Sequence, residues 1–223
     1  MPLTRYGYSH AISGFFEFPT ENARRILPRH LEPAELHHGS SIFSMTVFDF
    51  TESEVGSYGE VVMAVIVAPL VKPGEPLPKS AFYPYRVATT TRAAREHAIE
   101  RWHLPHWMDD VEISFEEGDG SRTARVVADG DAVAELTITD HSWNPVSHLY
   151  QSFMKDDDGA YLAHITMQGE ESEHEEESGH IELFDHAFNA ELDVAEVYEE
   201  PFREIWMRHG TQTFQPLVQL ETV

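Results

Sequence analysis

Short apolar stretches in which side chains alternate between two faces recur along the chain and predict a protein built mainly of β-strands. The clearest is 42–50, IFSMTVFDF, which combines β-branched and aromatic residues on both expected faces, so we expect burial on both sides. The two faces are Ile42, Ser44, Thr46, Phe48 and Phe50 against Phe43, Met45, Val47 and Asp49. Further strands are predicted at 11–18, 61–71, 82–91, 111–117, 123–128, 132–139, 147–153, 160–167 and 181–184, with a weak edge strand in 211–223.

Helical signals are few. A short helix is predicted at 21–27 with Thr20 as its N-cap and Pro28 as its stop, and another begins at Arg92 and ends at Leu104-Pro105-His106. A weak helical pattern covers 187–198, and a last short helix is expected from Pro201 to Gly210. The run 72–79, with three prolines, is expected to be a loop, and the acidic run 170–177 an exposed loop or strand edge.

About ten short strands joined by tight turns indicate a mostly β protein of the β-rich α+β kind, with an antiparallel barrel or sandwich. The strand pattern alone does not separate these two architectures. At 223 residues, we expect a single domain covering 1–223.

Composition narrows the classes of partner. The formal net charge of −24 argues against nucleic acid and against anionic membranes, because both need a basic face. No apolar run is long enough for a membrane helix, and the first residues carry no apolar leader segment. The chain has no cysteine, hence no disulfide or thiolate site, and we expect a cytoplasmic protein. The acidity is either an ordinary solvated surface or salt adaptation.

The sequence contains none of the short motifs HExxH, GxSxG, GxGxxG and GxxxxGK[ST], which mark zinc-protease, serine-hydrolase, dinucleotide and nucleotide-phosphate sites. His174, His180 and His186 lie in an acidic region that suits a metal or, more simply, a solvated surface, and we expect no metal and no cofactor. Glu60 ends a glycine-flanked loop before a strongly apolar strand. It is either a loop cap at a rim or a pocket acid with a pKa raised by burial.

Four segments, in order, resemble the acetoacetate decarboxylase-like family. They are Asn22–Pro28 with Leu31-Glu32-Pro33, the loop Ser53–Glu60, Ala94-Arg95-Glu96 with Trp102-His103-Leu104-Pro105, and Leu183–Ala187. The resemblance spans nearly the whole chain. It implies a cone-shaped β-barrel with peripheral helices around an enclosed, largely apolar pocket, and a homo-oligomer.

The resemblance does not carry over the family's nucleophile. The decarboxylases form a Schiff base on a lysine that follows the proline, and a second lysine lies beside it. Those positions correspond to His106 and Trp107 here, and two further pocket groups of the family fall at Ser9 and Met45. An imidazole cannot form the iminium that makes loss of CO2 easy. Among the family's pocket groups, Glu60 alone matches.

The function we expect is binding of a small carbonyl or carboxylate compound, such as an oxo-acid, with lysine-independent acid–base catalysis of the lyase, hydratase or isomerase type. His106 and Glu60 are the expected catalytic pair, because both fall where the family's pocket groups lie. The expected substrate-binding residues are Trp102, Tyr58, Met45 and Glu96. Two alternatives remain open: a non-catalytic binding barrel, and a decarboxylase that uses Lys79 instead.

Overall fold

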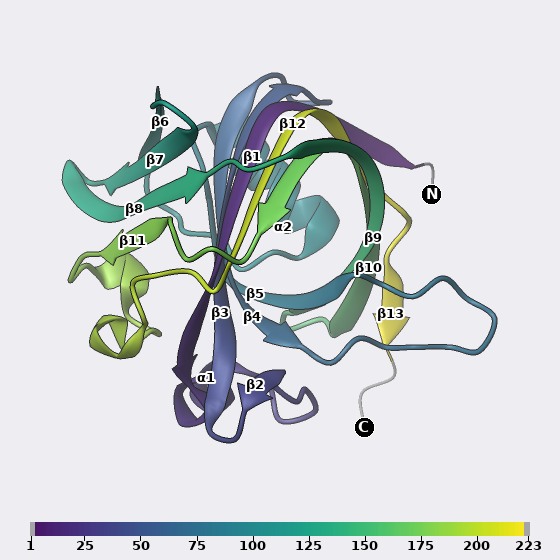
Figure 1. Ribbon diagram of the computed structural model, residues 1–223. Helices are drawn as coiled ribbons and strands as arrows, with labels where there is room; N and C mark the ends of the chain where they lie inside the picture. Colours follow the sequence, from purple (N-terminus) through teal and green to yellow (C-terminus); the bar gives the residue numbers. More distant parts are fainter. Residues whose placement is uncertain (1–2, 221–223) are drawn as a thin grey trace.

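A closed β-barrel forms the larger part of the computed structural model, which describes residues 3–220 (Figure 1). Seven strands form the ring, and pairing of the first, β1, with the last, β3, closes it. In their order around the ring, they are β1 (Thr4–Pro19), β12 (Arg203–Phe214), β10 (Ala160–His174), β9 (Trp143–Lys155), β5 (Ser80–Thr89), β4 (Tyr58–Val67) and β3 (Ser40–Glu52). Closure satisfies every strand edge within the ring, which settles the choice between barrel and sandwich.

All neighbouring strands of the ring are antiparallel except β5 and β9, which pair in parallel over residues 80–82 and 150–152. Two short strands extend the wall: β2 (Glu35–His37) on β3, and β13 (Val218–Leu220) on β10. The loop between β4 and β5, which includes the predicted turn 72–79, projects away from the barrel (Figure 1).

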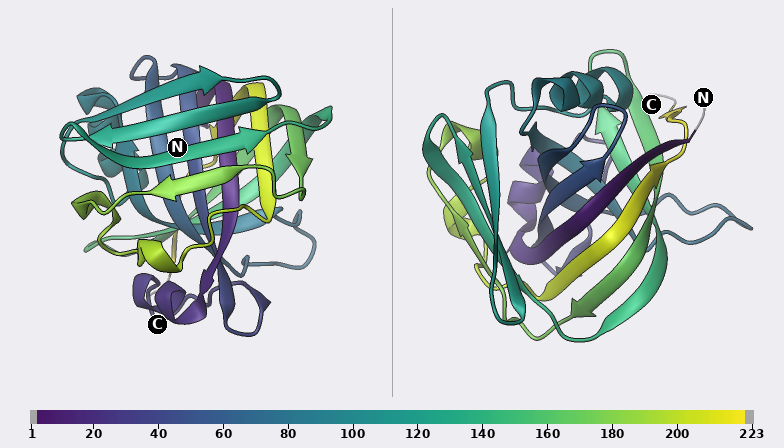
Figure 2. Two further views of the ribbon diagram at one scale, coloured as in Figure 1. Left: turned by 60° about the vertical axis from the view of Figure 1, so that its left-hand side comes forward. Right: turned by 90° about the horizontal axis from the view of Figure 1, so that it is seen from above.

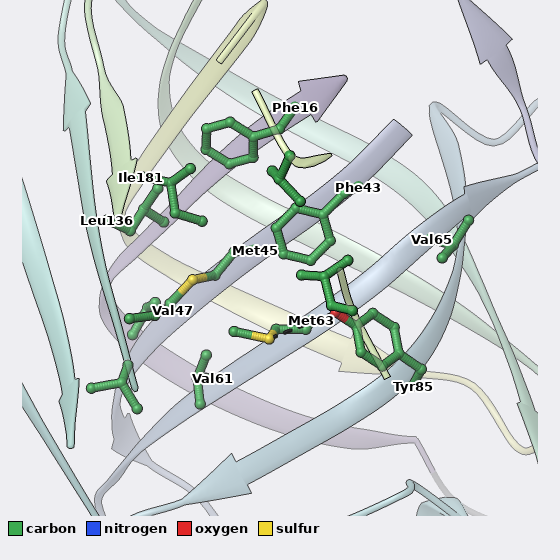
Figure 3. Close-up of a cluster of buried hydrophobic side chains, with 14 of the residues drawn as sticks. Phe16, Phe43, Met45, Val47, Val61, Met63, Val65, Tyr85, Leu136 and Ile181 are labelled. Carbon is green, nitrogen blue, oxygen red and sulfur yellow. Dashed lines mark hydrogen bonds between the residues drawn. The ribbon is translucent and has the colours of Figure 1, made fainter. Parts of the chain in front are cut away.

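A second, four-stranded sheet covers one outer face of the barrel. It runs in the order β11 (His180–Leu183), β8 (Asp131–Thr139), β7 (Ser121–Ala128) and β6 (Val111–Glu117), and its strands cross those of the barrel (Figure 2). Apolar side chains fill the space between the two layers, among them Phe43, Met45 and Leu136 (Figure 3). This packing makes the outward face of β3 as apolar as the inward one.

The interior of the barrel holds a separate apolar cluster that includes Phe48, Phe50, Tyr58, Trp102 and Ile165. Alternation along β3 explains the division: Thr46, Phe48 and Phe50 face the interior, whereas Phe43, Met45 and Val47 face the small sheet. The two faces predicted for 42–50 are therefore the two cores of the molecule.

Two α-helices are present in the described residues, α1 (Thr20–Ile26) and α2 (Arg92–Trp102). α2 lies across one end of the barrel (Figure 1) and buries Ala94, Ala98 and Trp102. Its N-cap is Thr91, whose side chain accepts from the Ala94 amide, and it ends at His103 in a left-handed conformation with φ of 55°. Thr20 is not the N-cap of α1. It lies in the first turn, and its hydroxyl bonds Ser41 Oγ at 2.9 Å.

Several predicted elements differ from the observed ones. The helix expected from Pro201 to Gly210 is wrong: Arg203–Phe214 is strand β12, which pairs with both β1 and β10. The acidic run is not a loop at its start, because 170–174 belongs to β10 and Glu171 is only 5% exposed. The segment 187–198 forms two 3-10 turns, Ala187–Asn189 and Val194–Glu196.

The expected tail strand divides between the end of β12 and β13, and 221–223 lie outside the described residues. Within residues 3–220, no helix is both long enough and apolar enough to cross a membrane.

Candidate functional site

The interior of the barrel contains a cavity of about 110 Å³. By the same measure one water molecule needs roughly 10–15 Å³, so the space admits a small organic molecule. Most of the lining is aromatic, aliphatic or methionine, and the polar groups are few. The lining residues are Ala11, Ser13, Phe15, Thr46, Phe48, Glu60, Val62, Phe82, Pro84, Trp102, Leu104, Tyr150, Ser152, Met154, Ile165, Met167, Ile205, Met207, Gln212 and Phe214.

Glu60 is the acidic group of this lining. It lies on β4 directly opposite Phe48 of β3 and Thr89 of β5, and the residue is 9% exposed. No hydrogen bond from the described residues reaches the carboxyl, and burial alone raises its pKa to about 8. At neutral pH the group is therefore mainly a neutral carboxylic acid that faces an apolar space.

Four strands bring further polar side chains to the cavity. Ser13 of β1 and Thr46 of β3 are cross-strand partners, and their hydroxyl oxygens lie 2.9 Å apart. Gln212 of β12 and Ser152 of β9 complete the set, and both are buried. Glu60 thus shares the cavity with neutral hydrogen-bonding groups.

Trp102, at the end of α2, forms part of the cavity wall. Its indole Nε1 donates to the Tyr6 hydroxyl at 2.7 Å, and its ring stacks on Phe214 with centroids 4.4 Å apart. The Tyr6 hydroxyl also forms a hydrogen bond of 2.7 Å with Nε2 of His97. Three elements therefore hold the Trp102 ring in one orientation.

His106 does not line the cavity; it lies behind Thr89. Its Nδ1 is 2.5 Å from the Trp107 carbonyl oxygen and its Nε2 is 3.1 Å from Thr89 Oγ1. Burial is the main cause that lowers the pKa of His106 to about 4, so the ring is neutral at pH 7. A carbonyl can only accept, so Nδ1 carries the proton and Nε2 is an acceptor. The Thr89 hydroxyl has one proton to donate, and both Nε2 and the Thr91 carbonyl oxygen, at 3.2 Å, are within its reach.

The expected pair of His106 and Glu60 is therefore indirect. Thr89 is the cross-strand partner of Glu60, and Cβ atoms of such pairs are about 4.5–5.5 Å apart. His106 reaches the Glu60 region only through the Thr89 hydroxyl, and its neutral ring has a hydrogen-bond partner at each nitrogen. No direct proton transfer from His106 to a ligand in the cavity follows from this geometry.

Of the four expected substrate-binding residues, one lines the cavity and three do not. Trp102 lines the cavity. Tyr58 faces the barrel interior beside Phe50, but it is not part of the lining. Met45 must be corrected: it faces outward into the core below the small sheet (Figure 3), because the alternation of β3 gives the interior to Thr46. Glu96 must also be corrected, since it lies on the solvent side of α2, where it accepts from Arg92 at 2.7 Å.

Lys79, the alternative Schiff-base lysine, lies outside the lining. Its ammonium is 2.7 Å from Glu173, 3.1 Å from Glu171 and 3.1 Å from the His148 ring. The two carboxylates already bind this amine, whereas an imine-forming lysine must be free to attack a carbonyl. These contacts argue against a decarboxylase built on Lys79.

Two of the three histidines of the acidic region have separate local partners, and the third is exposed. His174 Nε2 bonds the Thr139 carbonyl oxygen at 3.0 Å, and His186 caps a 3-10 turn by accepting from the Phe188 amide at 3.0 Å. His180 is exposed on β11.

Sequence reasoning did not select Ser13, Thr46, Thr89 or Gln212. A signal existed for Thr46, which shares the predicted inward face with Phe48 and Phe50. Gln212 was out of reach, because its segment was expected to be a weak edge strand and instead completes the wall of the barrel.

No protein-family profile matches this chain, and no curated protein sequence matches it either. Solved structures do match, at low identity over nearly the whole chain. An acetoacetate decarboxylase from Legionella pneumophila superposes with a TM-score of 0.66 at 15% identity, covering 99% of this chain and 88% of the other. Another acetoacetate decarboxylase gives a TM-score of 0.63 at 14% identity, covering 98% and 90%.

The chain has the acetoacetate decarboxylase-like fold. This confirms the resemblance read from the four sequence segments at the level of the barrel. A third match with the same fold is the enduracididine biosynthesis enzyme MppR complexed with pyruvate, with a TM-score of 0.61 at 13% identity and coverage of 98% of this chain and 90% of that one. The acetoacetate decarboxylase-like fold thus encloses the cavity that Glu60 lines.

Proposed function

We propose that this protein is an enzyme that moves a proton between the α-carbon and the oxygen of a small carbonyl compound, with Glu60 as its acid–base group. The observation that carries the proposal is a carboxyl without a hydrogen-bond partner among the described residues, buried in the wall of a largely apolar cavity. A buried acid whose pKa is shifted to about 8 is suited to proton transfer near neutral pH.

One neutral carboxyl group is sufficient for this reaction. Its O–H donates the proton to the carbonyl oxygen while its second oxygen accepts a hydrogen from the α-carbon. The C–H bond breaks, an O–H bond forms on the substrate, and the carboxyl is again protonated, now on its other oxygen. The ketone becomes an enol and Glu60 is regenerated, so neither a lysine nor a metal enters the step.

The remaining polar groups of the cavity support this role. The hydroxyls of Ser13 and Thr46 and the amide of Gln212 are neutral groups that can position an oxygen of the substrate. His106 has no proton-transfer step in this proposal. Another protein with this fold, MppR, has been solved in complex with pyruvate, a small carbonyl compound.

The test is exchange of the α-hydrogens of 2-pentanone in D2O, followed by NMR at pH 7. We expect the wild-type protein to accelerate exchange and Glu60→Gln to lower that rate by about 100-fold or more, because general acid–base groups contribute roughly 10²–10⁴. Glu96→Gln is the matched control, since Glu96 lies on the solvent side of α2, and it should keep the wild-type rate.

If 2-pentanone binds but wild-type exchange equals that of the buffer, the proposal fails, and the chain is a binding barrel without this chemistry. Equal exchange by the wild type and Glu60→Gln would remove Glu60 from the mechanism.

A further inference from the structure

The cavity contains a carboxyl but no group that would neutralise a second one. No lysine, arginine or histidine is among the residues of 3–220 that line it. Its other polar side chains are two serines, a threonine, a glutamine and Tyr150, whose pKa burial raises well above the usual value. Every lining residue other than Glu60 is thus uncharged at neutral pH.

Three cations near the barrel interior are already engaged. Arg101, whose guanidinium carbon lies 5.2 Å from the centroid of the Trp102 ring, donates to the Thr4 hydroxyl. The other two form a cluster with carboxylates. Lys79 is held between Glu171 and Glu173, and Arg203 lies 2.8 Å from Glu175 and 3.6 Å from Glu173. The carboxylates of this cluster outnumber its two cations. An anionic ligand would therefore find no free positive partner in this cluster.

The pKa of Glu60 indicates that the cavity disfavours a charged carboxylate. Desolvation is the cause of its raised pKa, so the protein's own carboxyl is driven toward the neutral form. A carboxylate of a bound ligand would meet the same loss of hydration, and it would also repel any ionised Glu60. A ketone or ester oxygen needs only a hydrogen-bond donor, and the protonated Glu60 supplies one.

We propose that the ligand of this cavity is an uncharged, largely apolar carbonyl compound, and that oxo-acids carrying a carboxylate are excluded. The proposal rests on the proposed function, whose substrate it narrows, and it departs from the oxo-acid that the sequence resemblance favoured. Methionine and aliphatic side chains, among them Met154, Ile165 and Met207, offer the ligand's alkyl part an adaptable surface.

The experiment compares two probes that share one ketone, methyl 4-oxopentanoate and 4-oxopentanoate. The affinity of each for the wild-type protein is measured at pH 7 by ligand-observed NMR titration. We expect the ester to bind at least ten times more tightly than the acid. Glu60→Gln should not restore binding of the acid, because the exclusion comes from the missing cation and not from the charge of Glu60.

Two cavity-filling variants place the binding site. Ala11→Leu and Ser152→Leu each add bulk to the lining from a different strand, and circular dichroism checks that each is folded. The ester should bind at least ten times more weakly to any folded filling variant. Undiminished binding to both folded variants would place the ester elsewhere and overturn the proposal.

The outcomes separate this proposal from the proposed function. Binding of 4-oxopentanoate as tight as that of its ester overturns the ligand class and leaves the Glu60-dependent exchange result standing. Selective binding of the ester without Glu60-dependent exchange supports the ligand class and refutes the chemistry. Failure of both probes to bind at millimolar concentration overturns the ligand class.

Discussion

Glu60 and His106 show how two residues close in space acquire opposite protonation behaviour from the same burial. Burial disfavours charge, so it raises the pKa of the carboxyl to about 8 and lowers that of the imidazole to about 4. Both groups are consequently neutral at pH 7. The two residues expected to form a catalytic pair are thus one neutral acid and one hydrogen-bonded ring behind Thr89.

Glu60 should make the stability of the fold depend on pH in an unusual direction for a carboxyl. Its pKa is higher in the folded chain, about 8, than its ordinary value of 4.5. The folded state therefore binds more protons between these values, and the stabilisation present below pH 4.5 is lost as the pH rises to about 8. The slope is about 1.4 kcal/mol per pH unit while this group titrates.

Urea unfolding of the wild type and Glu60→Gln at pH 5, 7 and 9 measures this effect, because the glutamine cannot titrate. The free energy of unfolding of the variant relative to the wild type should rise from pH 5 to pH 9. A difference that stays constant would show that Glu60 is not held neutral by burial.

At the scale of elements, β12 pairs with β1 and β10 and carries a fully buried glutamate. Glu204 of β12 has no exposed surface. One oxygen accepts from the amides of Ser178 (2.9 Å) and Gly179 (2.8 Å), and the other from the amide (2.7 Å) and hydroxyl of Thr139. This carboxylate joins the barrel to the end of β8 and to the loop before β11.

Glu204→Gln should lower the free energy of unfolding by about 1–3 kcal/mol or more, because the amide NH2 would face backbone donors and leave them unpaired. Equilibrium urea unfolding measures the change. Glu175→Gln is the control, since Glu175 is exposed and pairs only with Arg203 among the described residues; it should change stability by less than about 1 kcal/mol. A Glu204→Gln protein as stable as the control would contradict this account.

At the scale of the whole molecule, two apolar cores lie on the two sides of one barrel wall. The outer core packs below the small sheet (Figures 2 and 3), and the inner core surrounds the cavity. Met45 belongs to the outer core and Thr46 to the cavity lining. Adjacent residues of one strand therefore belong to different environments, one to the core between the sheets and the other to the cavity wall.

Met45→Ala tests this division. We expect it to lower the free energy of unfolding by about 2–5 kcal/mol through the void it leaves, while the affinity for methyl 4-oxopentanoate stays within twofold. Unfolding experiments and NMR titration give the two values, with Met108→Ala as the control at a position that is 63% exposed. A large loss of affinity with unchanged stability would return Met45 to the binding site.

The sequence by itself determined the strand-rich architecture and the two faces of 42–50, and it selected Glu60, which lines the cavity. Alternation and a carboxylate before an apolar strand are local signals. Together with the resemblance, it also predicted the barrel. It failed at 201–210, where a proline and helix-compatible residues favoured a helix. In the structure, pairing with β1 and β10 on both sides overrides that weak local preference.

Only the tertiary structure decided which residues share the cavity. Thr89 stands between Glu60 and His106 because the β4–β5 register places it there, and Gln212 enters because β12 completes the ring. The charge of the site is likewise a property of the tertiary structure. Nothing in the sequence shows that Lys79 forms ion pairs with Glu171 and Glu173. Register, closure and desolvation depend on contacts distant in sequence, so they are not encoded in any single stretch of the chain.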